Sequence, residues 1–268
     1  MERALSSADL PRASLQTQRS YIPQLRQLGF FEAIARHLGT SNLALEIGPS
    51  ASITEYGAFG DYVTAQETFG GALRVTTDMM QFHSSHDRLM LTHHQDEVVF
   101  AYHAAVKHAI GYQHYAGLAL TVMLSIARPY FTTNKIATSV EFDCPPPSSQ
   151  SVYEDFFGCP VRFGCPTLAV KFDRHLLDQP RRTPSTRLVT LSDVTRSALV
   201  PAPTDTVGAV QSLIRLGIND GGVGMEQVAD QLGLGQRTLR RRLDAAGITY
   251  RDLVAKTRIE RARELLTE

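Results

Sequence analysis

Residues 225–247, MEQVADQLGLGQRTLRRRLDAAG, contain two short stretches with helical periodicity, separated by a glycine-rich turn. In the first stretch the apolar residues recur at helical spacing and form one stripe: Met225, Val228, Ala229 and Leu232. Gly233 and Gly235 tolerate positive φ angles, so the chain can reverse sharply here, and Leu234 can point back between the helices. The segment therefore predicts a helix-turn-helix.

The second helix of this motif is predicted from about Gln236 to Ala246. Leu239 and Leu243 are four residues apart and are expected to face inward. The outward side of the first turns carries long side chains that can donate hydrogen bonds, namely Gln236, Arg237, Arg240 and Arg241. A recognition helix presents such a surface to the major groove, so these four are the candidate DNA-binding residues.

The charge distribution agrees with this prediction. Between Arg237 and Arg263 there are nine basic and three acidic residues, although the formal net charge of the whole chain is zero. A local excess of positive charge favours contacts with phosphate and rapid capture of DNA. A solvated arginine-rich helix with no partner would have the same composition, so charge alone does not separate the two interpretations.

Residues 228–266, VADQLGLGQRTLRRRLDAAGITYRDLVAKTRIERARELL, resemble the first helix-turn-helix of the AraC/XylS family of bacterial transcription regulators. The resemblance lies in the Ala-x-x-Leu-Gly of the first helix, the Arg-Thr-Leu-x-Arg-Arg-Leu of the second, and the Gly-Ile-Thr-Tyr-Arg-Asp-Leu that leads into a long linker helix. Residues 151–180, SVYEDFFGCPVRFGCPTLAVKFDRHLLDQP, are similar to the end of the sensory domain in one branch of that family. This branch includes ornithine-utilisation and mycobacterial virulence regulators, and the two similarities cover most of the chain from about residue 140.

The resemblance implies an N-terminal domain that senses a small effector or mediates dimerisation, and a C-terminal domain that binds promoter DNA. The implied partners are promoter DNA, a small-molecule effector, a second copy of the chain in a homodimer, and RNA polymerase. An AraC-type DNA-binding domain has two helix-turn-helix units, whereas this sequence ends at Glu268, inside or at the end of the linker helix. We therefore expect the second unit to be absent; a fragment, an incomplete gene and a natural short form all fit. The alternative is an effector-binding or dimerisation module without independent DNA-binding activity.

Length and composition set the broad class of protein. A chain of 268 residues with 43% apolar and 20% charged residues is long enough for two domains, each with its own core. Cys144, Cys159 and Cys165 lack Cys-x-x-Cys spacing and indicate reduced thiols. Residues 1–18 are too polar for a signal peptide, and the apolar run 116–127 is shorter than the roughly twenty residues that cross a bilayer. We therefore expect a cytoplasmic protein without a membrane partner.

The fold class predicted from these patterns is an α+β sensory domain over residues 1–180, followed by a linker over 181–203 and an incomplete all-α helix-turn-helix domain over 204–268. The sheet should be antiparallel or mixed, because hairpins and strand pairs outnumber helix-crossover units. Residues 88–103 alternate around a polar turn and predict a β-hairpin.

Other elements are predicted with less regular patterns. We expect helices at 14–38, closed by Gly39, at 67–82, at 104–130 with a break near Gly111 or Gly117, at 148–157, capped by Ser148, and at 206–218. We expect strands at 135–142, 161–163 and 167–172. The linker contains Pro184, Pro201 and Pro203, and a short helix is expected between them at 187–198.

The remaining candidates for chemistry are histidines and tyrosines. His83-x-x-His86 could bring two imidazoles to one metal ion, but no carboxylate or thiolate follows at a recognised spacing, so we predict no metal site. His103, His108 and His114 flank a predicted helix that carries two tyrosines, and this face fits either a small-molecule pocket or ordinary helix packing. The sequence has no nucleophile elbow, phosphate loop or paired carboxylates, so we predict no enzymatic activity and no cofactor.

Overall fold

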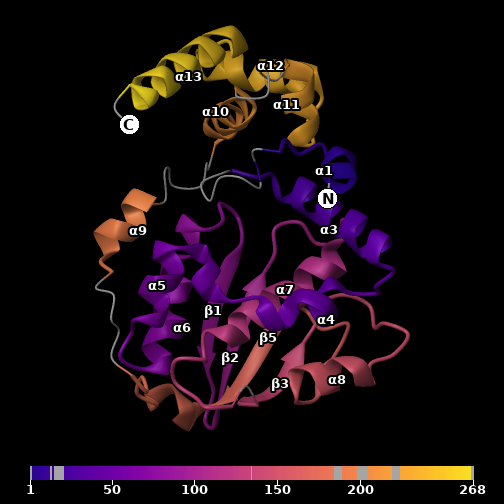
Figure 1. Cartoon of the computed structure of the whole chain (residues 1–268), viewed down its shortest axis with the longest axis vertical. Coiled ribbons are helices and arrows are strands. Elements are labelled where there is room, and N and C mark those ends of the chain that lie inside the picture. Colours follow the sequence, from indigo (N-terminus) through magenta and orange to yellow (C-terminus); the bar gives the residue numbers. More distant parts are fainter. Residues whose placement is uncertain are drawn as a thin grey trace.

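A computed structural model of the chain has a sheet covered by helices, followed by a separate group of helices (Figure 1). The structure describes residues 2–12, 14, 21–133, 135–183, 189–197, 205–218 and 224–266. The helices are α1 (Glu2–Ser7), α3 (Gln24–Leu38), α4 (Leu43–Ile47), α5 (Ala58–Thr64), α6 (Phe69–Asp78), α7 (Tyr112–Ser125), α8 (Ser151–Phe157), α9 (Leu191–Ser197), α10 (Thr206–Gly217), α11 (Met225–Gln231), α12 (Gln236–Ala245) and α13 (Tyr250–Leu265). The strands are β1 (Arg88–His93), β2 (Glu97–His103), β3 (Ala137–Glu141), β4 (Val161–Arg162) and β5 (Leu168–Asp173).

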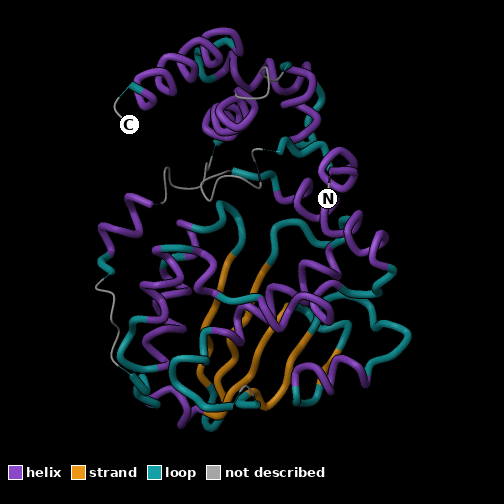
Figure 2. Tube along the Cα trace, in the orientation of Figure 1, coloured by secondary structure: helices purple, strands orange, loops and turns teal. Residues whose placement is uncertain are grey.

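The five strands form one mixed sheet in the order β1-β2-β5-β3-β4 (Figure 2). All neighbouring strands pair antiparallel except β3 and β4, which are parallel. The predicted hairpin is confirmed, with Leu91 opposite Phe100. The α+β class with a mixed sheet is confirmed as well, and its core lies where α7 packs on β5 and α6 packs on β1. Phe100, Leu120 and Phe172 are fully buried in this core.

Helix α3 differs from its prediction at its start and on its surface. It begins at Gln24, after Pro23, and the predicted turns over residues 15–20 lie outside the described residues. The predicted C-cap is confirmed, because Gly39 has a φ of 68°. By helical periodicity Leu25 and Leu38 belong on the same side as the buried Leu28, but they are 43% and 56% exposed. Both leucines lie at the edges of the narrow apolar stripe by which the helix packs on its neighbours, so neither side chain reaches the core.

The predicted helix over 104–130 is wrong over its first eight residues. Helix α7 begins at Tyr112, because Gly111 has a φ of 85° and cannot continue a right-handed helix. A Cβ atom at Gly111 would lie 2.1 Å from the carbonyl oxygen of Leu28, so the helix start fits closely against α3. The break at Gly111 is thus confirmed, whereas Gly117 lies inside the helix.

Two other helices are shorter than predicted. Helix α6 ends at Asp78 and is followed by a 3-10 turn, Met80–Phe82, instead of running to residue 82. The prediction that Ser148 caps α8 is wrong, because the helix starts at Ser151 with Gln150 at the N-cap position. The Gln150 side chain donates to the carbonyl oxygen of Val161 at 2.5 Å and so ties this helix start to β4.

The helices from α10 onward surround a second hydrophobic cluster. Its fully or almost fully buried members are Val210, Leu213, Ile214, Val228, Ala229, Leu239, Leu243 and Leu253. Helix α9 instead packs on α5, and its Val194 belongs to the first cluster. Pro184, Pro201 and Pro203 lie outside the described residues, and the domain limits 1–180, 181–203 and 204–268 stay a prediction. None of the described helices has the length and apolar character needed to cross a membrane.

Candidate functional site

Helices α11 and α12 are joined by a turn that glycine makes possible. Helix α11 ends at Gln231 with Leu232 as its C-cap, and Gly233 then adopts a φ of 66°. The backbone N–H of Leu234 donates to the carbonyl oxygen of Ala229 at 2.8 Å, which is the long hydrogen bond of a Schellman cap. Leu234 packs against the second cluster, so the turn is fixed from inside. The two helices and the turn therefore lie where the sequence predicts them.

Helix α12 is anchored by two leucines and exposes its arginines. Leu239 and Leu243 are 0% and 1% exposed. All four candidate DNA-binding residues are exposed, namely Gln236, Arg237, Arg240 and Arg241. Within the described residues, the guanidinium groups of Arg237, Arg240 and Arg241 have no hydrogen bond or ion pair to another side chain. The helix thus presents unpaired donors on a rigidly held surface, which is what phosphate and base recognition requires.

Helix α13 extends the basic surface beyond α12. It packs on α10, and Thr257 and Leu253 on its inner side are buried. Arg251, Lys256 and Arg258 are exposed. Lys256 lies 4.0 Å from Glu260, a solvent-screened contact that leaves its charge available to a polyanion.

The helical group touches the N-terminal part through α11. Arg26 of α3 forms an ion pair with Asp230 of α11, and the Gln231 side chain donates to the backbone oxygen of Asp9 at 3.2 Å. A Cβ atom at Gly233 would lie 3.6 Å from Leu25. The sequence analysis missed this contact, because its partners are more than 200 residues apart and no local pattern connects them.

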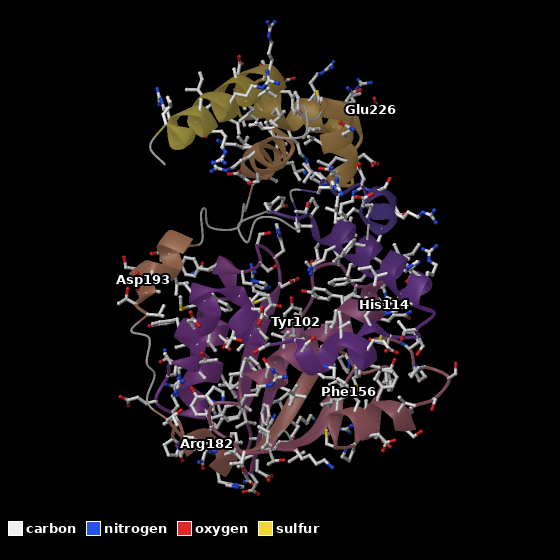
Figure 3. All side chains as sticks on the ribbon, in the orientation of Figure 1. Tyr102, His114, Phe156, Arg182, Asp193 and Glu226 are labelled. Carbon is white, nitrogen blue, oxygen red and sulfur yellow. The ribbon has the colours of Figure 1, made fainter. Side chains whose placement is uncertain are left out.

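A buried carboxylate organises the polar centre of the N-terminal part. Asp87, 1% exposed, accepts hydrogen bonds from side chains on three other elements and its own loop; we call this group the Asp87 network. Its members are Gln24 at 2.9 Å, Ser84 at 2.9 Å, Tyr102 at 2.5 Å, Tyr115 at 3.1 Å and the backbone N–H of Ala105 at 2.8 Å. Burial, together with the Asp87 charge, raises the pKa of both tyrosines. Figure 3 labels Tyr102 among the side chains that fill this region.

The predicted histidine and tyrosine face of α7 is divided in the structure. His114 is buried and points to Glu32, whereas Tyr115 joins the Asp87 network and Tyr112 donates to Asp143 at 2.9 Å. His103 is half-buried and His108 is exposed, so these five side chains do not form one surface. No local pattern in the sequence points to Asp87, because its main partners lie up to 63 residues away.

His83 and His86, the histidines considered as metal ligands, contact different partners. The ring of His83 packs 4.4 Å from that of Tyr56, and His86 makes a 2.9 Å hydrogen bond with Ser85. Over the part of the chain that the structure describes, no group of three or more metal-ligating side chains is found. The three cysteines are free thiols, and burial raises the pKa of Cys144 to about 11.

Comparisons with known proteins place these features in context. Residues 1–181 match the family model of the arabinose-binding domain of AraC transcription regulators, an N-terminal domain. The chain is similar to the HTH-type transcriptional regulator VirS of Mycobacterium tuberculosis, with 30% identity over 122 residues, 45% of this chain and 36% of that protein. It is similar to the HTH-type transcriptional regulator VqsM of Pseudomonas aeruginosa, with 30% identity over 126 residues, 44% of this chain and 38% of that protein. The matched part therefore spans little more than a third of these relatives.

A solved structure also resembles the chain. The crystal structure of the transcriptional regulator CdpR from Pseudomonas aeruginosa aligns with a TM-score of 0.47 and 19% sequence identity. The alignment covers 99% of this chain and 84% of that chain.

Proposed function

Because this chain belongs to the family of AraC transcription regulators that carry the N-terminal arabinose-binding domain, we propose that it is a transcription regulator that binds promoter DNA through α12. The observation that carries the proposal is a set of exposed donors on a helix fixed by two buried leucines, namely Gln236, Arg237, Arg240 and Arg241, for which no side-chain partner is found among the described residues. Arginine and glutamine can read guanine and adenine edges through paired hydrogen bonds.

The N-terminal α+β part is proposed to sense a small effector or to mediate dimerisation, as the resemblance implies. A homodimer would suit a helix-turn-helix protein, because such proteins commonly read two half-sites about one helical turn apart. RNA polymerase is proposed as a further partner, and the cytoplasm as the place of action. We propose no catalytic role, since the relatives are named as regulators.

The proposal is tested by fluorescence anisotropy of the chain on a labelled duplex from the region upstream of its own gene. Binding should saturate, survive excess random DNA and weaken steeply with salt, because each neutralised phosphate releases counterions. Arg240→Ala or Arg241→Ala should lose roughly 1–3 kcal/mol of discrimination between this duplex and random DNA if the residue contacts a base. Arg74→Ala, an exposed arginine on α6, is the matched control and should change nothing.

Either of two results would overturn this assignment. Arginine variants of α12 that bind as tightly and as selectively as the parent would exclude α12 as the reading surface. A folded chain without saturable binding would favour the alternative, an effector-binding or dimerisation module with no DNA-binding activity of its own.

A further inference from the structure

Strand β1 forms an unprotected edge of the sheet. The opposite edge strand, β4, has only two residues, and its Arg162 is held in an ion pair with Glu141. Strand β1 has six residues, pairs with β2 without a bulge, and among the described residues has no strand on its other side. Natural edge strands are usually short, bulged or interrupted by charged residues or proline, which prevents pairing with another chain. Residues 89–95, LMLTHHQ, contain no Lys, Arg, Asp, Glu or Pro.

The hairpin turn fixes which backbone groups of β1 face outward. The N–H of His94 donates to the carbonyl oxygen of Glu97 at 2.8 Å, so this pair is hydrogen-bonded across the hairpin. Hydrogen-bonded and non-hydrogen-bonded pairs alternate along an antiparallel ladder. The N–H and C=O groups of Leu89, Leu91 and His93 therefore point away from β2. Within the described residues, no hydrogen bond to these groups is found.

The second half of this edge is open to solvent. Leu89 is 8% exposed, but Leu91 is half-buried, and Thr92, His93 and His94 are exposed. Leu91 and His93 thus provide two donors and two acceptors that another strand can reach. An edge that carries donors and acceptors in alternation can bind an antiparallel copy of itself about a two-fold axis.

One register uses all four groups and also pairs opposite charges. With Thr92 on the axis, Leu91 of each copy exchanges two hydrogen bonds with His93 of the partner subunit. Arg88 then lies level with the partner subunit's Asp96, in the hairpin turn. Both side chains are exposed, and among the described residues Arg88 binds only backbone carbonyls and Asp96 has no ion pair. The charge pattern thus favours a second copy over an unrelated strand.

We propose that β1 pairs antiparallel with β1 of a second copy of the chain, so that the two five-stranded sheets join across a two-fold axis at Thr92. A contact of this kind uses the same surface on both subunits, closes a dimer and covers the β1 edge of each. The role of this dimer in reading two half-sites rests on the proposed function, whereas the contact itself does not.

The first test places a cysteine on the axis. Opposite residues of a non-hydrogen-bonded pair have Cα atoms about 4.5 Å apart, which a disulfide can span. Thr92→Cys in the full chain should therefore form a disulfide-linked dimer on mild oxidation with diamide, scored by non-reducing electrophoresis. Met90→Cys is the matched control on the same side of β1. Its two copies would stand four residues apart along the strand, roughly 13 Å, which is too far for a disulfide. The parent chain, with its three free cysteines, gives the background.

The second test removes one outward N–H group. His93→Pro deletes a donor to the partner subunit's Leu91 but leaves the ladder between β1 and β2 intact, because this N–H points away from β2. Sedimentation equilibrium of the full chain should show a reversible dimer for the parent and a dissociation constant larger by roughly tenfold or more for His93→Pro. His93→Ala keeps the N–H and should stay within about threefold of the parent.

The third test exchanges the charges. Arg88→Asp would place two carboxylates level with each other and should weaken the dimer by roughly three- to tenfold, less at high salt. Arg88→Asp together with Asp96→Arg restores opposite charges in the reverse order and should bring the dissociation constant to within about twofold of the parent. A loss caused only by damage to β1 would not be rescued by the second substitution.

The interface is overturned if the parent stays monomeric up to about 100 μM, if Met90→Cys cross-links as well as Thr92→Cys, or if His93→Pro dimerises like His93→Ala. If His93→Pro does not fold, the two cysteine variants decide. DNA binding is measured separately by anisotropy. A dimer that binds no DNA would contradict the regulator proposal alone, and a monomer that binds DNA would contradict the β1 interface alone.

Discussion

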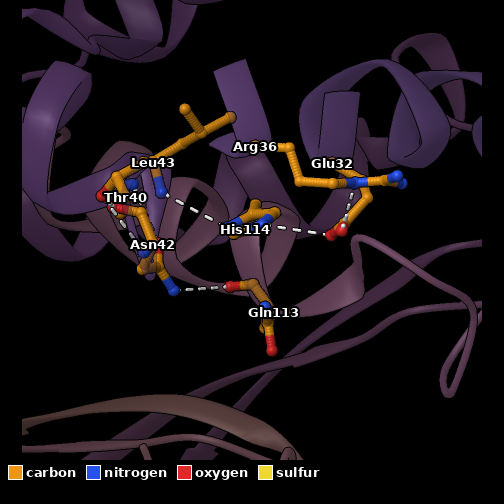
Figure 4. Close-up of polar contacts among 8 residues, drawn as sticks. Glu32, Arg36, Thr40, Asn42, Leu43, Gln113 and His114 are labelled. Carbon is orange, nitrogen blue, oxygen red and sulfur yellow. Dashed lines mark hydrogen bonds and ion pairs between the residues drawn. The ribbon is translucent and has the colours of Figure 1, made fainter. Parts of the chain in front are cut away.

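The Nε2 atom of His114 lies 3.3 Å from a carboxylate oxygen of Glu32, and this buried contact joins α7 to α3 (Figure 4). On the other side of the ring, Nδ1 accepts a hydrogen bond from the backbone N–H of Leu43, also at 3.3 Å. Both contacts are satisfied by the neutral imidazole with its proton on Nε2. Protonation of Nδ1 would place two donors face to face and would break the contact with Leu43.

Stability should therefore fall in mild acid. Burial lowers the pKa of His114 below its ordinary 6.5, although Glu32 opposes this. The unfolded chain then binds more protons than the folded one, so stability is complete above pH 6.5 and is lost as pH falls through the lowered pKa. Urea unfolding at about pH 7.5 and about pH 5.5 checks the sign. His83, whose pKa is also lowered, contributes in the same direction.

The variant His114→Gln distinguishes the contribution of His114 to the pH dependence of stability from that of His83. At neutral pH this variant should lose roughly 1–3 kcal/mol of unfolding free energy, because glutamine cannot satisfy both Glu32 and Leu43. Its stability should depend less on pH between the same two values than that of the parent. An unchanged pH dependence would show that His114 does not carry the effect.

A methyl group at Gly111 should disrupt the start of α7. Gly111→Ala combines a φ of 85° with a Cβ atom 2.1 Å from a backbone oxygen of Leu28, and should cost at least about 3 kcal/mol of unfolding free energy. Gly39→Ala is the matched control, because Gly39 has a φ of 68° but no atom within 4 Å of the added Cβ. It should cost only about 1 kcal/mol by thermal or urea unfolding. Equal costs would mean that the close approach to Leu28 is absent in solution.

These two glycines illustrate how far the sequence predicts the fold. Gly39 ends α3, and the two leucines of α12 form its buried side. Both roles depend only on residues nearby in the chain, so cap signals and helical periodicity predict them. A helix break near Gly111 was predicted, but the close approach of Gly111 to Leu28 was not, because no local pattern joins these two residues. The Asp87 network could not be predicted either, because its members are far apart in the sequence. Gln24 and Tyr115 contact this carboxylate only in the packed fold of the sheet and its helices.

The contact between Arg26 and Asp230 should be measurable but weak. The Asp230 side chain is 73% exposed, so a double-mutant cycle with Arg26→Ala and Asp230→Ala should give a coupling energy of at most about 1 kcal/mol, smaller at high salt. Hydrogen exchange of α11 should become faster in either single variant, because α11 loses a tether to α3. The pair Arg36 and Glu32, four residues apart within α3, is the control and should leave α11 unaffected. Zero coupling at low salt would contradict the contact.

Leu239→Ala tests whether the two hydrophobic clusters are independent units, as the predicted domain limits require. Leu239 is fully buried in the second cluster, so its truncation should cost roughly 2–5 kcal/mol in the helical group. Leu120→Ala makes the same change in the first cluster. If the clusters unfold separately, calorimetry should show two transitions, with Leu239→Ala lowering one and Leu120→Ala the other. The ion pair between Arg26 and Asp230 is too exposed to merge them. A single transition shifted by both variants would instead mean that α11 and α3 unfold as one body, and that the division near residues 181–203 is wrong.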